Sequence, residues 1–274
     1  MARVEIRLLR NVEEARQCEV VQTHVWGAPG VTREAMTAVR KYGGALIGTL
    51  IDGKVVGFIL AFLAQYHGRL VHWSHMMAVE AKYRDQGLGF KMKLVHREVA
   101  TERGIKSICW TFDPLQSRNA RLNISRLGAL PEEYVPDCYG RFPSLLEKGL
   151  PSDRWVVNWQ ITTAQVEARL RGETPAFDPG LPRVNETLAN SQGFPKNQTI
   201  RLGLTARRLL VETPAQTDAM RIQSMPLARL WRFEARRIFQ HYLAAGYHVE
   251  DFFPPQTATE GRCYYLLVRR AQLD

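Results

Sequence analysis

The chain has 274 residues, 45% of them hydrophobic, and a formal charge of +10 from 37 Lys and Arg against 27 Asp and Glu. This composition excludes a disordered chain and predicts one large or two ordinary globular domains with a sizeable core. The charge favours a polyanionic partner, which can be nucleic acid, a membrane surface or a phosphorylated small molecule. The basic residues form no Lys/Arg-rich block and no nucleic-acid-binding signature, so nucleic acid is the weakest of these three.

Cysteine spacing and hydropathy indicate the compartment. The four cysteines are widely spaced, form no C-x-x-C pair and follow no secretory pattern, which predicts reduced thiols in a cytoplasmic protein. The longest apolar stretch, 55–64, is too short to span a bilayer and predicts a buried strand. We therefore expect no membrane partner and no metal site.

The N-terminal pattern predicts a strand over 4–11, two helices and a hairpin. Asn11 is placed to cap a helix over 12–27, and the residues spaced for its buried face are Val12, Ala15, Val20 and Val21. Thr32 is placed to cap the second helix. Asp52-Gly53 lies between two β-branched runs and predicts a type I′ turn, because both of its central residues need positive φ.

A strand over 69–79 is followed by the loop YRDQGLGFKM, residues 83–92, and then by a helix. The residues predicted to face a sheet from this helix are Met92, Leu94, Val95, Val99 and Ala100. Further on, we expect a strand that ends at Pro114, a helix from Ser117 or Asn119 to Gly128, and a strand over 154–161.

The stretch 174–198 is rich in Pro, Asn and Gly, which predicts a linker or a long surface loop. Beyond it we expect one or two strands over 200–214, a helix over 226–245, and two closing strands over 247–253 and 263–270. The aromatic residues of this last helix predicted to be core are Trp231, Phe233, Phe239 and Tyr242. The predicted organisation is a first domain over 1–165, a linker over 166–198 and a β-α-β-β region over 199–274.

The glycine loop allows three interpretations: a turn, a solvated basic loop, or a phosphate cradle. A loop between a strand and a helix exposes first-turn amides that lack intrahelical partners, and the helix dipole adds positive potential. Glycines let a phosphate approach this backbone, and Arg84 and Lys91 add charge at the edges. Gly87-x-Gly89 alone is a weak signal.

The wider context strengthens the third interpretation. The run V-E-A-K-Y-R-D-Q-G-L-G over 79–89 resembles the V-x-P-x-x-R-x-x-G-x-G/A signature of the GNAT superfamily of acyl-CoA-dependent N-acyltransferases, with Ala81 in place of the proline. The expected strand order and the stretch 113–129 also resemble that superfamily, over roughly residues 4–160. The resemblance implies a mixed α/β fold with a central mixed sheet flanked by helices, and a C-terminal region that resembles half of such a domain.

The resemblance also implies an acyl-CoA cosubstrate. The acyl group, acetyl or another short group with succinyl as one option, would pass to the amine of a small molecule or amino acid, in a monomer or homodimer. The residues that it places at the cofactor are Met77, Ala78, Val79, Arg84, Asp85, Gln86, Gly87, Leu88, Gly89, Phe90, Lys91, Asn119 and Asn123. The alternatives are a catalytically idle acyl-CoA sensor or interaction module and a basic nucleic-acid-binding protein.

His75 is the first candidate for the base that deprotonates the amine, because imidazole has a near-neutral pKa and relatives carry a histidine four residues before the position of Val79. The alternative is that His75 and the nearby His72 are structural, and Glu80 is a weaker candidate base.

The sequence departs from the family at Ile124, which stands where a proton-donating tyrosine is usual. Tyr139, Tyr134 or a water is then expected to substitute, unless the thiolate leaves unassisted. Arg118 or Arg154 would clamp a substrate carboxylate, unless Asp153-Arg154 only caps a strand.

Overall fold

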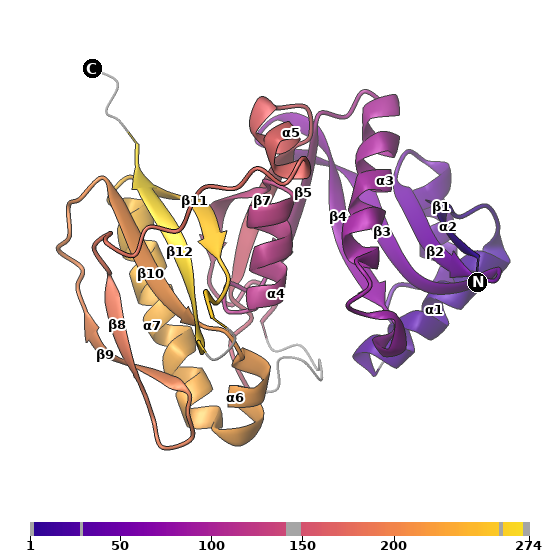
Figure 1. Cartoon of the computed structure of the whole chain (residues 1–274). Coiled ribbons are helices and arrows are strands. Elements are labelled where there is room, and N and C mark those ends of the chain that lie inside the picture. The colour runs from indigo at the N-terminus through magenta and orange to yellow at the C-terminus, as the bar shows by residue number, and fades with distance from the viewer. Residues whose placement is uncertain (1–2, 28–29, 141–148, 258–259, 271–274) are drawn as a thin grey trace. The chain divides into compact units, whose positions relative to one another are not determined.

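The computed structural model describes residues 3–27, 30–140, 149–257 and 260–270 (Figure 1). The chain divides into two compact units. The first unit comprises residues 1–110, 142–148 and 159–162, and the second comprises 111–141, 149–158 and 163–274. Strands and helices alternate through both units, so the predicted mixed α/β class is confirmed.

The sheet of the first unit has four antiparallel strands in sequence order and a fifth strand parallel to the fourth. Its strands are β1 (Val4–Leu8), β2 (Ala45–Ile51), β3 (Lys54–Tyr66), β4 (Arg69–Val79) and β5 (Ser107–Phe112), the last belonging to this unit as far as Trp110. The turn between β2 and β3 has φ of 49° at Asp52 and 80° at Gly53, as the type I′ prediction requires.

Helices cover both faces of this sheet (Figure 1). They are α1 (Val12–Trp26) and α2 (Arg33–Lys41) on one face, packed on Leu46 and Phe58, and α3 (Leu88–Glu102) on the other, where Met92 is buried with Ile59. The side chains of Asn11 and Thr32 accept bonds from the amides of Glu14 and Ala35, which confirms both N-caps.

Two face predictions in these helices need correction. In α1, Val12 and Val20 are 53% and 46% exposed, whereas Cys18 and Gln22 are buried. Gln22 is buried because its side-chain amide bonds both backbone groups of Val31, which an apolar pattern does not reveal. In α3, Leu94 is only half-buried, whereas the half-buried Val95 packs against the core cluster of Ile59 and Met92, as predicted.

The second unit holds three groups of strands. β6 (Leu130–Val135) pairs antiparallel with β7 (Arg154–Gln160), whose residues 154–158 belong to this unit. β10 (Arg208–Pro214), β12 (Arg262–Arg269) and β11 (Tyr247–Phe253) form an antiparallel sheet in that order, and β8 (Asn185–Ala189) pairs with β9 (Pro195–Ile200). Its helices are α4 (Ser117–Ala120), which continues as a π-helical turn over Arg121–Arg126, α5 (Ala164–Leu170), α6 (Thr217–Gln223) and α7 (Met225–Ala244).

The expected linker over 166–198 contains most of α5, all of β8 and the start of β9, so part of it forms regular structure. Polar tertiary bonds stabilise this segment. The buried Asn185 side chain donates to the carbonyl of Glu212 (3.0 Å) and accepts from its amide (2.9 Å). A pattern of apolar residues cannot predict a strand held in this way, and the boundary at 166–198 stays a prediction.

The core assignment in α7 is confirmed for Trp231, Phe239 and Tyr242 and is wrong for Phe233, which is 41% exposed. The guanidinium carbon of Arg236 instead lies over the Phe233 ring, 5.2 Å from the centroid of that ring. Among the described helices, none is long and apolar enough to cross a membrane.

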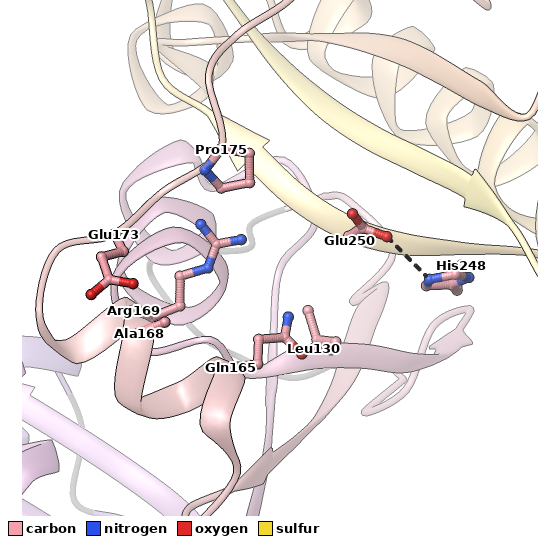
Figure 2. A pocket seen from close by; sticks show the side chains of 8 residues that line it. All are labelled: Leu130, Gln165, Ala168, Arg169, Glu173, Pro175, His248 and Glu250. Atoms are coloured by element: carbon pink, nitrogen blue, oxygen red, sulfur yellow. Dashed lines mark ion pairs between the residues drawn. The ribbon is translucent and has the colours of Figure 1, made fainter.

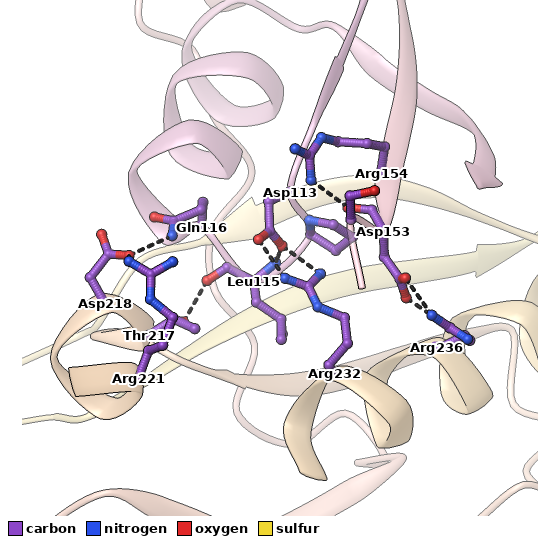
Figure 3. A network of polar contacts seen from close by, with 12 residues as sticks. Asp113, Leu115, Gln116, Asp153, Arg154, Thr217, Asp218, Arg221, Arg232 and Arg236 are labelled. Carbon is purple, nitrogen blue, oxygen red and sulfur yellow. Dashed lines mark hydrogen bonds and ion pairs between the residues drawn. The ribbon is translucent and has the colours of Figure 1, made fainter. Parts of the chain in front are cut away.

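Two arginines of α7 form ion pairs with carboxylates of the second unit (Figure 3). Arg232 donates to both oxygens of Asp113 (2.8 and 2.5 Å), and Arg236 donates to both oxygens of Asp153 (2.9 and 2.6 Å). Burial raises the pKa of Asp113, but the charge and hydrogen bonds of Arg232 outweigh it, so this pKa lies below its ordinary value. The C-terminal helix is thereby tied to residues that precede β6 and β7.

We expect Arg232→Met to lower the free energy of unfolding by roughly 3 to 5 kcal/mol, because it leaves the Asp113 carboxylate without its cation. Urea unfolding measures the difference. Arg201→Met, which breaks an exposed pair with Glu186, is the matched control and should cost less than about 1 kcal/mol. Equal losses of unfolding free energy in both variants would show that the buried pair stabilises the protein no more than the exposed pair does.

Candidate active site

The parallel pairing of β4 and β5 is short. It joins His72 to Ile108 and Trp73 to Cys109, and no further pair of these strands forms among the described residues. On its other side, β4 stays paired with β3 up to Val79. Residues 74–79 of β4 therefore carry one edge, here called the unpaired edge, whose main-chain groups are not bonded to a neighbouring strand. Such an edge can bind an extended ligand by main-chain hydrogen bonds.

A β-bulge lies at the start of the unpaired edge. Met76 pairs with Leu60 and Ser74 with Ala61, so His75 is the extra residue of β4. Its side chain is exposed and lies beside Phe62, with 5.7 Å between the ring centroids. Desolvation lowers the pKa of His75 below its ordinary value. His75 is therefore neutral and accessible near pH 7, as a general base must be.

His72 is not equivalent to His75. It is fully buried, its Nδ1 lies 3.1 Å from His96 Nε2, and its Nε2 lies 3.2 Å from the carbonyl oxygen of Gly43. Burial lowers the pKa of His72. Both of its ring nitrogens are engaged, which makes this histidine structural.

The glycine loop joins the end of β4 to the start of α3. After a short 3-10 turn (η1, Ala81–Tyr83), Asp85 and Gly87 adopt positive φ of 64° and 73°, and Gly87 is the N-cap of α3. Arg84 Nε donates to the carbonyl of Val79 (3.1 Å), which fixes the loop to the strand. The first turn of α3 contains no acidic residue, and a Cβ built on Gly87 meets no atom within 4 Å. This geometry suits the approach of a phosphate to the helix amides.

The other predicted residues of this region divide by exposure. Gln86 and Lys91 are exposed beside the loop, Gly89 and Phe90 are half-buried, and Leu88 is 4% exposed, so only its main chain faces a ligand. Met77 and Val79 pack toward α3, while Ala78 packs toward α1. Glu80 lies 3.0 Å from His24 Nδ1 and 4.0 Å from Lys82 Nζ, which makes it a poorer base than His75.

The remaining predicted residues belong to the second unit. Arg118 and Asn119 are exposed on α4, whereas Asn123 and Ile124 are 4% and 0% exposed on the π-helical turn. The side chain of Ile124 is therefore part of the core of this unit.

The structure brings Tyr139 and Arg154 together. The Tyr139 hydroxyl lies 2.8 Å from Thr111 Oγ1, and the Arg154 guanidinium lies 5.3 Å from the Tyr139 ring. Arg154 also donates to the carbonyl of Asp153 (3.0 Å; Figure 3), and burial lowers its pKa. Tyr134 donates to the Asp153 carboxylate (2.7 Å), and burial raises its pKa, so it is a poor proton donor.

A cavity of about 440 Å³ lies in the second unit (Figure 2). Its lining residues are Leu130, Gln165, Ala168, Arg169, Glu173, Pro175, His248 and Glu250, none of which the sequence predicted as a site. Arg169 already pairs with the buried Asp251 (2.9 Å). Within the described residues, no group of three His, Cys, Asp or Glu is placed to hold a metal ion.

Sequence reasoning missed Lys93, a buried lysine of α3 that hydrogen-bonds Ser74 of β4. A signal was available, because Lys93, His96 and Ala100 follow the i, i+3, i+7 spacing of one helix face and Ala100 was assigned to the core. A lysine at such a position is normally expected to point to solvent.

Comparison with known proteins agrees with this geometry. Residues 11–123, which make up less than half of the chain, match the model of the Acetyltransferase (GNAT) family. The predicted resemblance and fold are thereby confirmed. No curated protein sequence matches the chain.

Several solved structures are similar in fold. The ribosomal-protein-S18-alanine N-acetyltransferase of Escherichia coli has 14% identity and a TM-score of 0.48, covering 59% of this chain and 96% of its own. A GNAT-family acetyltransferase of Streptococcus pneumoniae has 16% identity and a TM-score of 0.46, covering 57% and 98%. A putative acetyltransferase of Salmonella typhimurium, solved with its cofactor acetyl-CoA, has 16% identity and a TM-score of 0.45, covering 59% and 96%. These values are too low to transfer a substrate.

Proposed function

We propose that this protein is an acyl-CoA-dependent N-acyltransferase that acts on the amine of a small molecule or amino acid. One observation carries the proposal: the unpaired edge of β4 leads directly into the glycine loop and the N-terminus of α3, inside the segment that matches the acetyltransferase family. A thioester is already activated. The protein therefore has to bind the donor, stabilise an oxyanion and accept a proton.

The proposed roles follow from this arrangement. Amides of residues 86–90 bind the pyrophosphate, and main-chain groups of Met77 and Val79 pair with the pantetheine arm, one of their amides serving as the oxyanion donor. His75 accepts the proton of the amine. In the second unit, Arg154 beside Tyr139 is the proposed ligand of a substrate carboxylate, with Arg118 as the alternative.

A second candidate is an acyl-CoA sensor without turnover. It is favoured by one observation, the buried Ile124 at the position where relatives have a proton donor. The sensor and the enzyme share the same donor site and differ only in chemistry.

Release of free thiol from acetyl-CoA in the presence of a panel of amines and amino acids separates the two. We expect thiol release that depends on both the acyl-CoA and at least one amine, because an activated thioester held beside a neutral imidazole needs only the nucleophile. Binding of acetyl-CoA with no release above the rate without protein would favour the sensor. Salt-dependent binding of DNA or RNA, without binding of acetyl-CoA, would favour a nucleic-acid-binding protein instead.

A further inference from the structure

Lys93 is a buried lysine with no anionic partner. Its side chain is 2% exposed, and its Nζ donates to Ser74 Oγ (3.0 Å) and lies 3.5 Å from the centroid of the Trp110 ring. No carboxylate among the described residues forms an ion pair with it, and burial lowers its pKa to about 7. Lysines are rarely buried unless they are paired, so this one requires an explanation.

The ionisable groups that act on His96, one of which is Lys93, are all basic. Burial lowers the pKa of both His96 on α3 and His72 on β4, the charge of Arg103 at the end of α3 lowers both further, and no acid contributes. His96 is fully buried, and its Nδ1 has no hydrogen-bond partner among the described residues. Among these groups there is therefore no acid that could serve as the counter-charge of a protonated Lys93.

The position of Lys93 relates it to the proposed donor site. Ser74 and Trp110 are the residues that directly follow the last paired residues of β4 and β5. Lys93 contacts both, so it lies at the end of the unpaired edge where the pairing of β4 with β5 stops. The glycine loop lies at the other end, beyond Val79. A donor with its phosphates on the loop and its arm along β4 has its acyl group directed toward Ser74 and Lys93.

We propose, as a consequence of the function proposed above, that the donor is the thioester of a short dicarboxylic acid whose free carboxylate binds Lys93 and Ser74. An acetyl group would leave the Lys93 ammonium without a counter-charge. A carboxylate supplies this charge and accepts a charge-assisted hydrogen bond from Nζ, which has three donors and uses one for Ser74. The Trp110 ring forms the apolar wall beside the cation.

Calorimetry with coenzyme A, butyryl-CoA and succinyl-CoA tests this recognition, because the two acyl groups have the same number of carbons and differ by a terminal carboxylate. We expect succinyl-CoA to bind on the order of ten-fold to a hundred-fold more tightly than butyryl-CoA. A carboxylate beside Lys93 raises its pKa, so succinyl-CoA should also take up a fraction of a proton at pH 7. Titrations in two buffers of different ionisation enthalpy measure this uptake.

Lys93→Met should remove both the preference and the proton uptake while leaving the affinity for coenzyme A unchanged. Methionine fills a similar volume without a charge, so the variant should also be at least as stable as the parent in thermal unfolding. Lys106→Met, at an exposed lysine of the first unit, is the matched control and should keep the preference.

The outcomes separate the two proposals. Binding of coenzyme A with equal affinities for butyryl-CoA and succinyl-CoA, and without proton uptake, overturns the role of Lys93 and leaves the proposed function intact. No binding of coenzyme A itself overturns the proposed function and this inference with it. A preference for succinyl-CoA that survives in Lys93→Met assigns the carboxylate to another residue and also overturns the inference. Both wild-type measurements stand even if the variant does not fold.

Discussion

Gly87→Glu is expected to abolish the binding of coenzyme A. Position 87 has φ of 73° at the N-terminus of α3, so a side chain there would stand where the phosphates are proposed to approach the helix amides. The glutamate charge would repel the phosphates and would itself occupy the favourable field of the helix terminus. Calorimetry with coenzyme A should show no measurable heat of binding.

The matched control is Gly104→Glu. Gly104 has φ of 71° and, like Gly87, a Cβ that would meet no atom within 4 Å, so both variants add the same charge and the same backbone strain. Gly104 follows the C-terminal end of α3 and is far from the loop along the helix. Unchanged affinity in a folded Gly87→Glu protein, or equal loss in both variants, would show that the loop is not a phosphate cradle.

His75→Ala should slow acyl transfer by roughly a hundred-fold to ten-thousand-fold, the range typical for the loss of a general base. His75 is exposed on the bulge of β4, so its removal should cost little stability and leave the affinity for coenzyme A nearly intact. His67→Gln, at an exposed histidine of the β3–β4 turn, is the control and should keep full activity. His72→Ala is a poor control, because the buried His72 bonds His96 and Gly43.

The dependence of kcat on pH gives an independent test of His75. Only the neutral imidazole accepts a proton, so the rate should fall as pH drops through the pKa of His75. Desolvation lowers this pKa, which places the acid limb below pH of about 6.5, the ordinary value for histidine. The limb should vanish or move in His75→Ala. A full rate with an unchanged acid limb in that variant would transfer the role to Glu80 or a water.

Features that depend on local backbone chemistry were predictable from the sequence. The Asp52-Gly53 turn, the Asn11 and Thr32 caps and the loop at Gly87 each need particular residues at fixed offsets, and all four occur where expected. The family signature overlaps this loop, which is why the sequence places the predicted cofactor-binding residues of the first unit there.

Features that depend on tertiary polar contacts were not predictable. Lys93 is buried where its Nζ hydrogen-bonds Ser74 and lies over the Trp110 ring. The strand β8 is held by hydrogen bonds from the Asn185 side chain to the backbone of β10. The bulge at His75 also has no sequence signal, since it follows from how β3 and β4 register against each other. The pattern pointed to His75 as the candidate base but did not reveal the local geometry that exposes it.

The second unit combines residues 111–141 and 149–158 with residues 163–274, and this separation along the chain affects how the unit folds during synthesis. The hydroxyl of Tyr265 donates to the carbonyl of Pro114 (2.6 Å) across 151 positions, and Arg232 reaches Asp113 across 119. At roughly 5 to 20 residues per second, Pro114 leaves the ribosome about 8 to 30 s before its partner is made. Until then Trp155 and Tyr134 lack Phe239 and Tyr265, the rings that cover them, so we infer that this unit completes its folding only after the last strand is synthesised.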